Sequence, residues 1–399
     1  MFTTLSLSLL VNLLPLCAAL PDLRLREALS STLHSPLASK RSTNLDGTGI
    51  NFNPNGSAFL WLPFDEYSGE SFFDRWTFFE GTDPTNGSVD YVNRSRAIEQ
   101  GYISVTADGE VIMKADDQTV LPMGQNRESV RISSNVTYDT GLFILDLNRA
   151  PWGCAIWPAF WTVGSNWPAN GEIDILEGVH DNEHNQVAWH TNPGCLLDPS
   201  ATFTGQIAQT NGANNTNCDG NVNSNSGCDI TEWSQASYGP FFEAQGGGIL
   251  AMKWDENDIS VWSFFRAAIP NDVTQGTPNP SLWGPPSAML KNTQCDIPKF
   301  FANHQIVFDI TFCGDWAGNS YATSGCPGTC AERLMDPTNF VNATWSINSL
   351  QVYRKQLIAG NGTKLQQTSD ARPRALRIDF AVMQIVLPAL TAVALSFIW

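Results

Sequence analysis

The sequence predicts an all-β fold, a sandwich of two antiparallel sheets. From residue 50 to residue 353, short runs of alternating apolar and polar residues recur between turns rich in Gly, Pro and Asn. Helical periodicity is scarce over the same range. Many short strands joined by such turns are typical of a sandwich. We find neither an internal repeat nor a second set of elements, so we expect one domain over residues 46–355.

The first strands should form a hairpin. Residues 101–106 and 110–114 alternate, and Asp108-Gly109 between them suits a tight turn. Further strands are expected at residues 129–132, 142–146, 156–161, 170–178, 186–190, 250–254, 259–264, 305–311 and 345–353. Two stretches are expected to be surface loops: residues 206–228, rich in Asn and Gly, and residues 270–286, rich in Pro.

The N-terminal segments differ in character from this domain. Residues 1–19 are predicted to be a secretory signal peptide, because an apolar run precedes the small residues Cys17-Ala18-Ala19. Residues 20–45 are polar and irregular, and we expect an N-terminal arm or a propeptide. Lys40-Arg41 is a candidate processing site, and an uncleaved arm is the alternative.

The C-terminal end combines a polar spacer, residues 356–379, with an apolar run, residues 380–399. The run is apolar nearly all round, unlike a core helix. A permanent span would leave the arginines of the spacer on the non-cytoplasmic side, against the usual tendency. Small residues at Ser369-Asp370-Ala371 followed by a spacer and an apolar tail predict a GPI-attachment signal, with Ser369 as the attachment site. A tail anchor and a buried helix are the alternatives.

The composition restricts the class of ligand. The formal net charge is −17, which argues against a nucleic-acid partner because phosphates would be repelled. A neutral polysaccharide is compatible with this charge. The 14 Trp and 22 Phe residues could supply apolar platforms for sugar rings.

The cysteine count suits an exported protein. Loss of Cys17 with the signal peptide leaves eight, enough for up to four disulfides: Cys154, Cys195, Cys218, Cys228, Cys295, Cys313, Cys326 and Cys330. Cys218 and Cys228 are close enough in sequence to pair, as are Cys326 and Cys330. A zinc site is the alternative, but the cysteines are dispersed and lack partnering His spacings.

Seven N-glycosylation sequons also indicate export. They begin at Asn55, Asn86, Asn93, Asn135, Asn214, Asn342 and Asn361.

Three carboxylates on one apolar strand, Glu172, Asp174 and Glu177, are the main functional signal. Alternation puts Glu172 and Asp174 on one face of the strand and would turn Glu177 to the other. A β-bulge at Ile175-Leu176 would return Glu177 to the first face. Like charges so close raise one another's pKa values, and a protonated and an ionised carboxyl side by side are what glycosidic bond cleavage needs. Ordinary acids on a solvent-facing strand are the alternative.

The sequence resembles glycoside hydrolase family 16, in particular its fungal laminarinase-like endo-β-1,3(4)-glucanases. The resemblance runs from about residue 64 to residue 353. It is carried chiefly by Trp157-Pro-Ala-Phe-Trp161, Trp167-Pro-Ala-Asn-Gly-Glu-Ile-Asp-Ile-Leu-Glu177-Gly, Gln186-Val-Ala-Trp-His-Thr191 and Cys313-Gly-Asp-Trp-Ala317. It implies a β-jelly-roll sandwich whose concave sheet forms a glucan cleft. It also implies roles for the acids: Glu172 as nucleophile, Glu177 as general acid/base, and Asp174 as the residue that sets the charge state of Glu172.

Six further residues are candidates for substrate binding. Trp161 and Trp167 match family positions near the nucleophile, His190 matches a histidine near the acid/base, and Arg131 matches a cleft arginine. Trp157 and Trp316 complete the set. The alternative for the aromatic residues is a place in the sandwich core.

The sequence therefore predicts a secreted, retaining endo-β-glucanase that acts on β-1,3 or mixed β-1,3/1,4 glucan. No cofactor and no metal are expected, and we expect a monomer attached to the plasma membrane or cell wall through the GPI anchor. A cell-wall transglycosylase is the first alternative, although the extra residue in the acidic strand favours hydrolases within the family. A non-catalytic glucan-binding protein is the second, although the three acids are all present.

Overall fold

The computed structural model describes residues 49–359, apart from 211 and 236, and residues 364–365. The predicted signal peptide, N-terminal arm, Asn361, Ser369 and apolar C-terminal run lie outside the described residues. No helix within the described ranges is long and apolar enough to cross a membrane.

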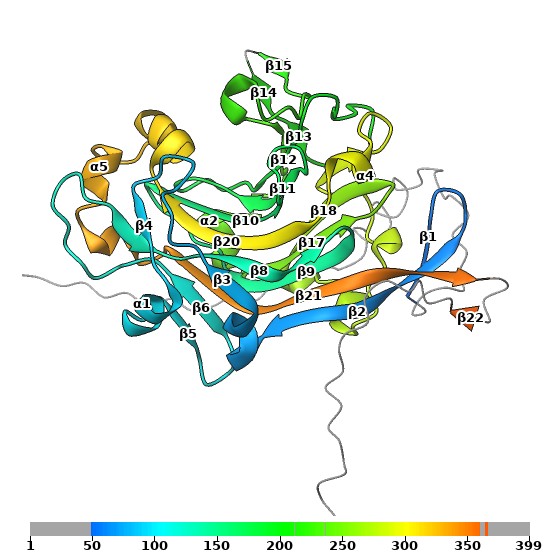
Figure 1. Ribbon diagram of the computed structural model, residues 1–399, viewed down its shortest axis with the longest axis horizontal. Coiled ribbons are helices and arrows are strands. Elements are labelled where there is room, and N and C mark those ends of the chain that lie inside the picture. The colour runs from blue at the N-terminus through cyan, green and yellow to red at the C-terminus, as the bar shows by residue number, and fades with distance from the viewer. Residues whose placement is uncertain (1–48, 211, 236, 360–363, 366–399) are drawn as a thin grey trace, which may run out of the picture. The chain divides into compact units, whose positions relative to one another are not determined.

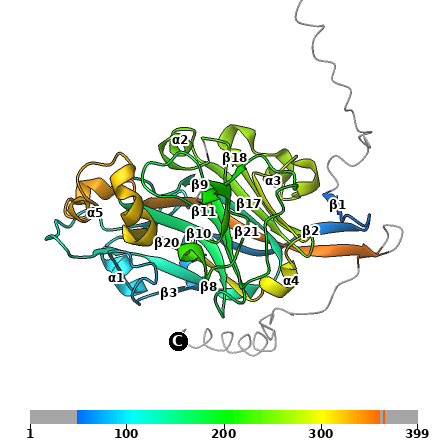
Figure 2. The ribbon, with the colours of Figure 1, turned by 90° about the horizontal axis from the view of Figure 1, so that it is seen from above.

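Two curved antiparallel sheets lie one over the other (Figures 1 and 2), so the predicted sandwich is confirmed. The ten-stranded sheet has the order β1-β2-β21-β9-β17-β18-β19, with β6 and β22 paired to β21 and β5 paired to β6. Its strands are β1 (Ile50–Phe52), β2 (Ala58–Ser68), β5 (Ile103–Val105), β6 (Val111–Lys114), β9 (Gly141–Arg149), β17 (Gly248–Trp254), β18 (Asp258–Phe265), β19 (Ala288–Lys291), β21 (Thr344–Ala359) and β22 (Lys364–Leu365). The predicted hairpin is β5–β6. The last residues of β21 fall within the segment assigned above to the spacer.

The eight-stranded sheet has the order β13-β16-β12-β11-β10-β20-β8-β3. Its strands are β3 (Trp76–Phe78), β8 (Arg131–Tyr138), β10 (Ile156–Gly164), β11 (Glu172–Glu177), β12 (Gln186–His190), β13 (Gln206–Ile207), β16 (Cys228–Thr231) and β20 (His304–Phe312). Two small pairs stand apart: β4 (Val89–Tyr91) with β7 (Arg127–Ser129), and β14 (Gln209–Thr210) with β15 (Ala213–Asn214). The acidic strand β11 is therefore an interior strand of its sheet, paired on both sides.

The helices are short and join the strands. The α-helices are α1 (Arg94–Glu99), α2 (Gly239–Ala244), α3 (Asn271–Thr274), α4 (Ile297–Phe300) and α5 (Cys330–Arg333). The 3₁₀ and π turns are η1 (Gly69–Arg75), η2 (Asn223–Asn225), η3 (Arg266–Ala268), η4 (Pro280–Leu282), η5 (Gly314–Gly318), η6 (Tyr321–Thr323) and η7 (Pro337–Phe340). Sequence reasoning did not find them, because one or two turns are too short for a 3.6-residue period to show.

The core lies between the sheets and follows from strand alternation. In β20, Ile306, Phe308 and Ile310 are fully buried in this core. Phe308 stacks on Phe160 of β10, with ring centroids 4.6 Å apart. The alternate residues of β20, including Asp309, therefore face the other side of the eight-stranded sheet.

The ten-stranded sheet is also covered on its second face. Phe59 and Trp61 of β2 belong to a separate buried cluster, against which Ile269, Val273 and Trp283 pack. These three residues come from the Pro-rich segment 270–286 and its immediate neighbour, so the predicted loop serves as a cover for the sheet. Because both faces of β2 meet apolar neighbours, its sequence lacks a clear alternation, and the strand was not predicted.

Four disulfides join the eight cysteines: Cys154–Cys326, Cys195–Cys295, Cys218–Cys228 and Cys313–Cys330. The pairing Cys218–Cys228 is confirmed. The pairing of Cys326 with Cys330 is wrong. Cys154 precedes β10 and Cys313 follows β20, and these strands pair with Ile156 opposite Phe312. The register thus brings both cysteines to one end of the sheet, where each binds one of the two cysteines near α5.

Most predicted sequons are accessible. The asparagines at 55, 86, 93, 135 and 214 are exposed, and Asn342 is half-buried. The structure therefore allows glycosylation at these sites.

Candidate active site

The acidic strand β11 carries a β-bulge between Asp174 and Glu177. Two residues, Ile175 and Leu176, separate these acids, but their partners on β12 are separated by one residue. The register toward β10 shifts at the same place. Ile175 and Leu176 are both fully buried in the core, so the extra residue returns Glu177 to the face of Glu172. The predicted bulge is confirmed.

The three acids line a cleft of about 660 Å³ on the eight-stranded sheet. All six predicted binding residues line the same cleft: Arg131, Trp157, Trp161, Trp167, His190 and Trp316. A cleft of this size, with aromatic walls and a few polar groups, has the character of a ligand site.

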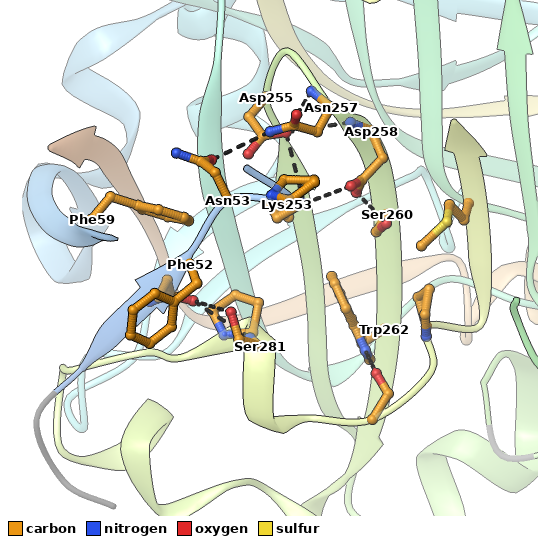
Figure 3. A pocket seen from close by; sticks show the side chains of 16 residues that line it. Phe52, Asn53, Phe59, Lys253, Asp255, Asn257, Asp258, Ser260, Trp262 and Ser281 are labelled. Atoms are coloured by element: carbon orange, nitrogen blue, oxygen red, sulfur yellow. Dashed lines mark hydrogen bonds and ion pairs between the residues drawn. The ribbon is translucent and has the colours of Figure 1, made fainter. Parts of the chain in front are cut away.

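A second concavity, of about 250 Å³, lies against the ten-stranded sheet beside β1, β17 and β18 (Figure 3). Its charged groups bind one another: Lys253 Nζ lies 2.8 Å from Asp258 Oδ2 and 3.7 Å from Asp255 Oδ1. We call this concavity the lysine pocket. It pairs its acids with a lysine, whereas the cleft gathers three acids beside one histidine.

His190 of β12 stands beside two of the cleft acids. Its Nε2 lies 3.3 Å from Asp174 Oδ2 and 3.6 Å from Glu172 Oε1. Burial lowers the pKa of His190, but Glu172 and Asp174 outweigh it and raise this pKa to about 10. The imidazole is therefore cationic near neutral pH and offsets part of the negative charge. Its Nδ1 lies 3.0 Å from Asn225 Oδ1, which can accept the second N–H.

Glu172 is half-buried among charges of both signs. Burial, followed by the adjacent Asp174, raises the pKa of Glu172 to about 8. Three groups favour its ionised form: His190, Arg131 and a hydrogen bond from Trp167.

Glu177 sits in a similar position with fewer compensating groups. Burial and Asp174 raise its pKa well above the ordinary range for a carboxyl. Trp157 Nε1 donates to Glu177 Oε1 at 2.7 Å, which favours the ionised form and opposes this rise. Trp157 thus contacts the acid itself and is held edge-on by Trp316, with ring centroids 5.8 Å apart.

The remaining aromatic residues line the cleft in two ways. Trp167 is 42% exposed and offers an open apolar face. Trp161 is fixed, because its Nε1 donates to Asp309 Oδ2 at 3.1 Å and the Arg131 guanidinium lies 4.9 Å from its ring centroid. Open and fixed aromatic faces in one cleft suit the apolar faces of sugar rings.

Asp309 and Asn225 are among the cleft residues that sequence reasoning did not single out. Asp309 stands in one cross-strand row with Ala159 and Glu177. Burial raises its pKa to about 7, against the opposing charge of Arg131. Alternation along the apolar strand β20 turns Asp309 away from the core and toward the cleft, so the sequence pattern could have identified it. Asn225 comes from the loop closed by Cys218–Cys228, and no sequence pattern marks it.

Two groups of side chains in the described chain lie close enough to hold a metal ion. One contains Cys154 and Cys326, whose sulfurs are joined in a disulfide. The other is Glu172, Asp174 and His190. There His190 pairs with both carboxylates, which raise its pKa to about 10.

The fold and the cleft agree with what comparison with known proteins finds. A family model described as the XgeA-like, catalytic GH16 domain matches residues 76–353. The chain belongs to glycoside hydrolase family 16. The resemblance seen in the sequence is thereby confirmed. A probable glycosidase of Schizosaccharomyces pombe is 43% identical over 76% of this chain and 71% of its own length.

Other GH16 relatives are longer than this chain. The endo-1,3(4)-beta-glucanase xgeA of Emericella nidulans is 38% identical over 73% of this chain but only 47% of its own length. The chain thus spans about half of this curated relative.

Two solved structures match over almost their full length. Laminarinase 16A of Phanerochaete chrysosporium, a GH16 protein solved with β-glucans in donor and acceptor sites, is 39% identical over 74% of this chain and 99% of its own, with a TM-score of 0.70. An elongating GH16 β-1,3-glucosyltransferase is 38% identical over 74% and 100%, with a TM-score of 0.69. The expected jelly-roll sandwich of this family is therefore confirmed.

Proposed function

We propose that this protein is an endo-β-glucanase that hydrolyses β-1,3 or mixed β-1,3/1,4 glucan with retention of configuration. The observation that carries the proposal is the bulge in β11, which turns Glu172 and Glu177 to one face inside an aromatic cleft. Two carboxyls on one face supply the nucleophile and the proton donor of a double displacement. The activity named for the relatives supports the choice of glucan.

In the first step, ionised Glu172 attacks the anomeric carbon. The bond to the leaving oxygen breaks, and that oxygen takes the proton of Glu177. The products are a glycosyl ester on Glu172 and a shortened glucan. The surroundings rank the two acids in this order, because three groups favour ionised Glu172 (His190, Arg131 and Trp167) and two favour ionised Glu177 (Trp157 and His190).

In the second step, water replaces the leaving sugar. Glu177, now ionised, takes a proton from the water, whose oxygen attacks the anomeric carbon and displaces Glu172. Trp157 supports this base by donating to Glu177 Oε1. His190 and Asp174 form an ion pair, which keeps their charges balanced while Glu177 loses and regains its proton.

A β-1,3-glucan transglycosylase is the second candidate. The similarity to an elongating β-1,3-glucosyltransferase favours it, because that protein matches this chain as well as the laminarinase does. The two activities share the glycosyl ester and differ in the acceptor, water or a sugar hydroxyl. Incubation with laminarin and lichenan separates them: we expect reducing ends to rise steadily, whereas longer oligomers without new reducing ends would overturn the hydrolase proposal.

We also propose that the protein is a glycosylated monomer, exported and held at the cell surface by a GPI anchor on Ser369. Eight cysteines in four disulfides and exposed sequons support export. Treatment of intact cells with a GPI-specific phospholipase should release active protein, and S369F should abolish that release. Retention after phospholipase treatment would argue for another form of attachment.

A further inference from the structure

A buried amide, Asn185, binds the backbone of the bulge. Its Oδ1 accepts from the Glu177 N–H at 2.9 Å, and its Nδ2 donates to the Ile175 carbonyl oxygen at 2.8 Å. The side chain is fully buried. A bulge takes backbone groups out of the ladder, and buried backbone groups need partners. One side chain supplies two partners at the point where the strand is irregular.

Asn185 is itself fixed by hydrogen bonds to Ser237 and Glu232. Its backbone N–H donates to Ser237 Oγ at 2.8 Å, and its carbonyl oxygen accepts from the Glu232 N–H at 2.8 Å. Its Nδ2 also donates to Glu232 Oε1 at 3.0 Å. Glu232 is 2% exposed and accepts from Ser263 Oγ at 2.6 Å. The amide therefore has one satisfied orientation, with its oxygen toward an N–H and its nitrogen toward two oxygens.

The contacts place Glu177 from two directions. Trp157 binds its carboxyl group in the cleft, at 2.7 Å, and Asn185 binds its backbone N–H on the other side. The position of the carboxyl depends on both, because a shift of the backbone at the bulge moves the point from which the side chain projects. Catalysis is sensitive to such shifts, since a displacement of 1 Å can lower a rate about a hundredfold.

We propose that Asn185 is a positioning residue for the general acid, acting through the backbone of the bulge, with Glu232 as its support. This inference rests on the proposed function, in which Glu177 donates the proton. Asn185 touches neither the glucan nor the bond that breaks. Its loss should therefore affect the reaction chiefly where proton donation is needed.

The experiment compares two substrates in N185A. Glucan needs a proton on its leaving oxygen, whereas a laminari-oligosaccharide with a 2,4-dinitrophenolate leaving group does not. We expect the glucan rate to fall about ten- to a hundredfold and the pre-steady-state burst of dinitrophenolate, which reports the first step alone, to change less than threefold.

The matched control is N51A. Asn51 is 1% exposed, donates to the Gly49 carbonyl oxygen at 2.9 Å and accepts from Ser281 Oγ at 3.1 Å beside the lysine pocket. Its loss removes a similar set of buried hydrogen bonds far from β11. N51A should lower the melting temperature and leave the ratio of the two rates unchanged.

Three results would overturn the proposal. An unchanged ratio in folded N185A would show that Asn185 only stabilises the fold. A changed ratio in N51A would show that the ratio reports stability. If wild-type protein cleaves neither substrate, the proposed function fails as well, so the two failures are distinguishable. If N185A does not fold, N185D carries the test: it keeps the acceptor for the Glu177 N–H but loses both donors, and it should lower the same ratio.

Discussion

The cleft and the lysine pocket both bury acids, and they shift the pKa of those acids in opposite directions. In the cleft, burial and Asp174 raise the pKa of Glu172 to about 8. In the lysine pocket, burial alone would raise the pKa of Asp255, but Lys253 and Lys355 outweigh it and lower this pKa below its ordinary value. Asp255 is 1% exposed, and its Oδ2 lies 2.8 Å from Lys355 Nζ.

The difference lies in the sign of the neighbours and not in the depth of burial. An acid between two lysines is stable in its ionised form and is suited to holding strands together. Acids beside acids are poised to exchange protons, and such perturbed groups are typical of functional sites. Buried charge therefore stabilises the fold in the lysine pocket and serves the chemistry in the cleft.

Removal of a cleft carboxyl should have the largest effect on activity. We expect E172Q to abolish turnover and E177Q to lower the rate on glucan by about 10²–10⁴-fold, the usual contribution of a general acid. Neither should lower the melting temperature, because each substitution keeps the shape of the side chain and adds no charge to a row of acids whose pKa values are raised. Reducing-sugar release and differential scanning fluorimetry provide the two measurements. Full activity in E172Q would refute the assignment of the nucleophile.

The opposite result is expected for D255N in the lysine pocket. Loss of this carboxylate removes the partner that Lys253 and Lys355 share and leaves each with one other acid, which should lower the free energy of unfolding by about 2 kcal/mol. The rate per folded molecule should not change. Urea denaturation gives the free energy, and D296N, at an exposed position, is the control. A drop in specific activity of the folded variant would show that the lysine pocket affects catalysis as well as stability.

The same contrast predicts how stability depends on pH. The pKa values of Glu172 and His190 are raised in the folded protein, to about 8 and about 10, above their ordinary values of 4.5 and 6.5. The folded state then holds more protons than the unfolded state between pH 4.5 and 10, so stability should fall as pH rises through that window. The pKa of Asp255 is lowered, so its contribution is present above its ordinary pKa and is lost as the pH falls toward its folded pKa.

Melting temperatures measured from pH 3 to pH 10 check this expectation. The slope on the alkaline side should become shallower in E172Q, and the loss on the acid side should become smaller in D255N. If D255N altered the alkaline slope, the assignment of each slope to its region would be wrong.

Sequence patterns predicted the parts of the site that depend on strand period. Glu177 could be placed beside Glu172 because a two-residue period breaks once, between Asp174 and Glu177, and one added residue restores it. The partners of Glu177 were not predictable in the same way. The role of Asn185 depends on how the backbone of the bulge meets the start of β12, and that contact exists only in the folded sheet.

The errors have the same cause. Cys326 and Cys330 are near neighbours in sequence, but the register of β10 with β20 brings a closer partner to each. Strand β2 shows no alternation because a third layer covers its outer face. Local patterns therefore predicted strands and their faces, whereas the disulfide pairing and the cover over β2 depend on contacts between distant segments.

The smallest expected effect is that of W157F on the pH dependence of activity. Trp157 donates to Glu177 and lowers its pKa, so without this hydrogen bond the pKa of Glu177 should rise. The first step needs protonated Glu177, so the alkaline limb of the pH profile of kcat/KM should move to higher pH. W316F is the matched control, because Trp316 packs edge-on against Trp157 and replacement by Phe keeps an aromatic ring there. A shift in W316F equal to that in W157F would mean that ring packing, and not the N–H donor, sets the pKa of the acid.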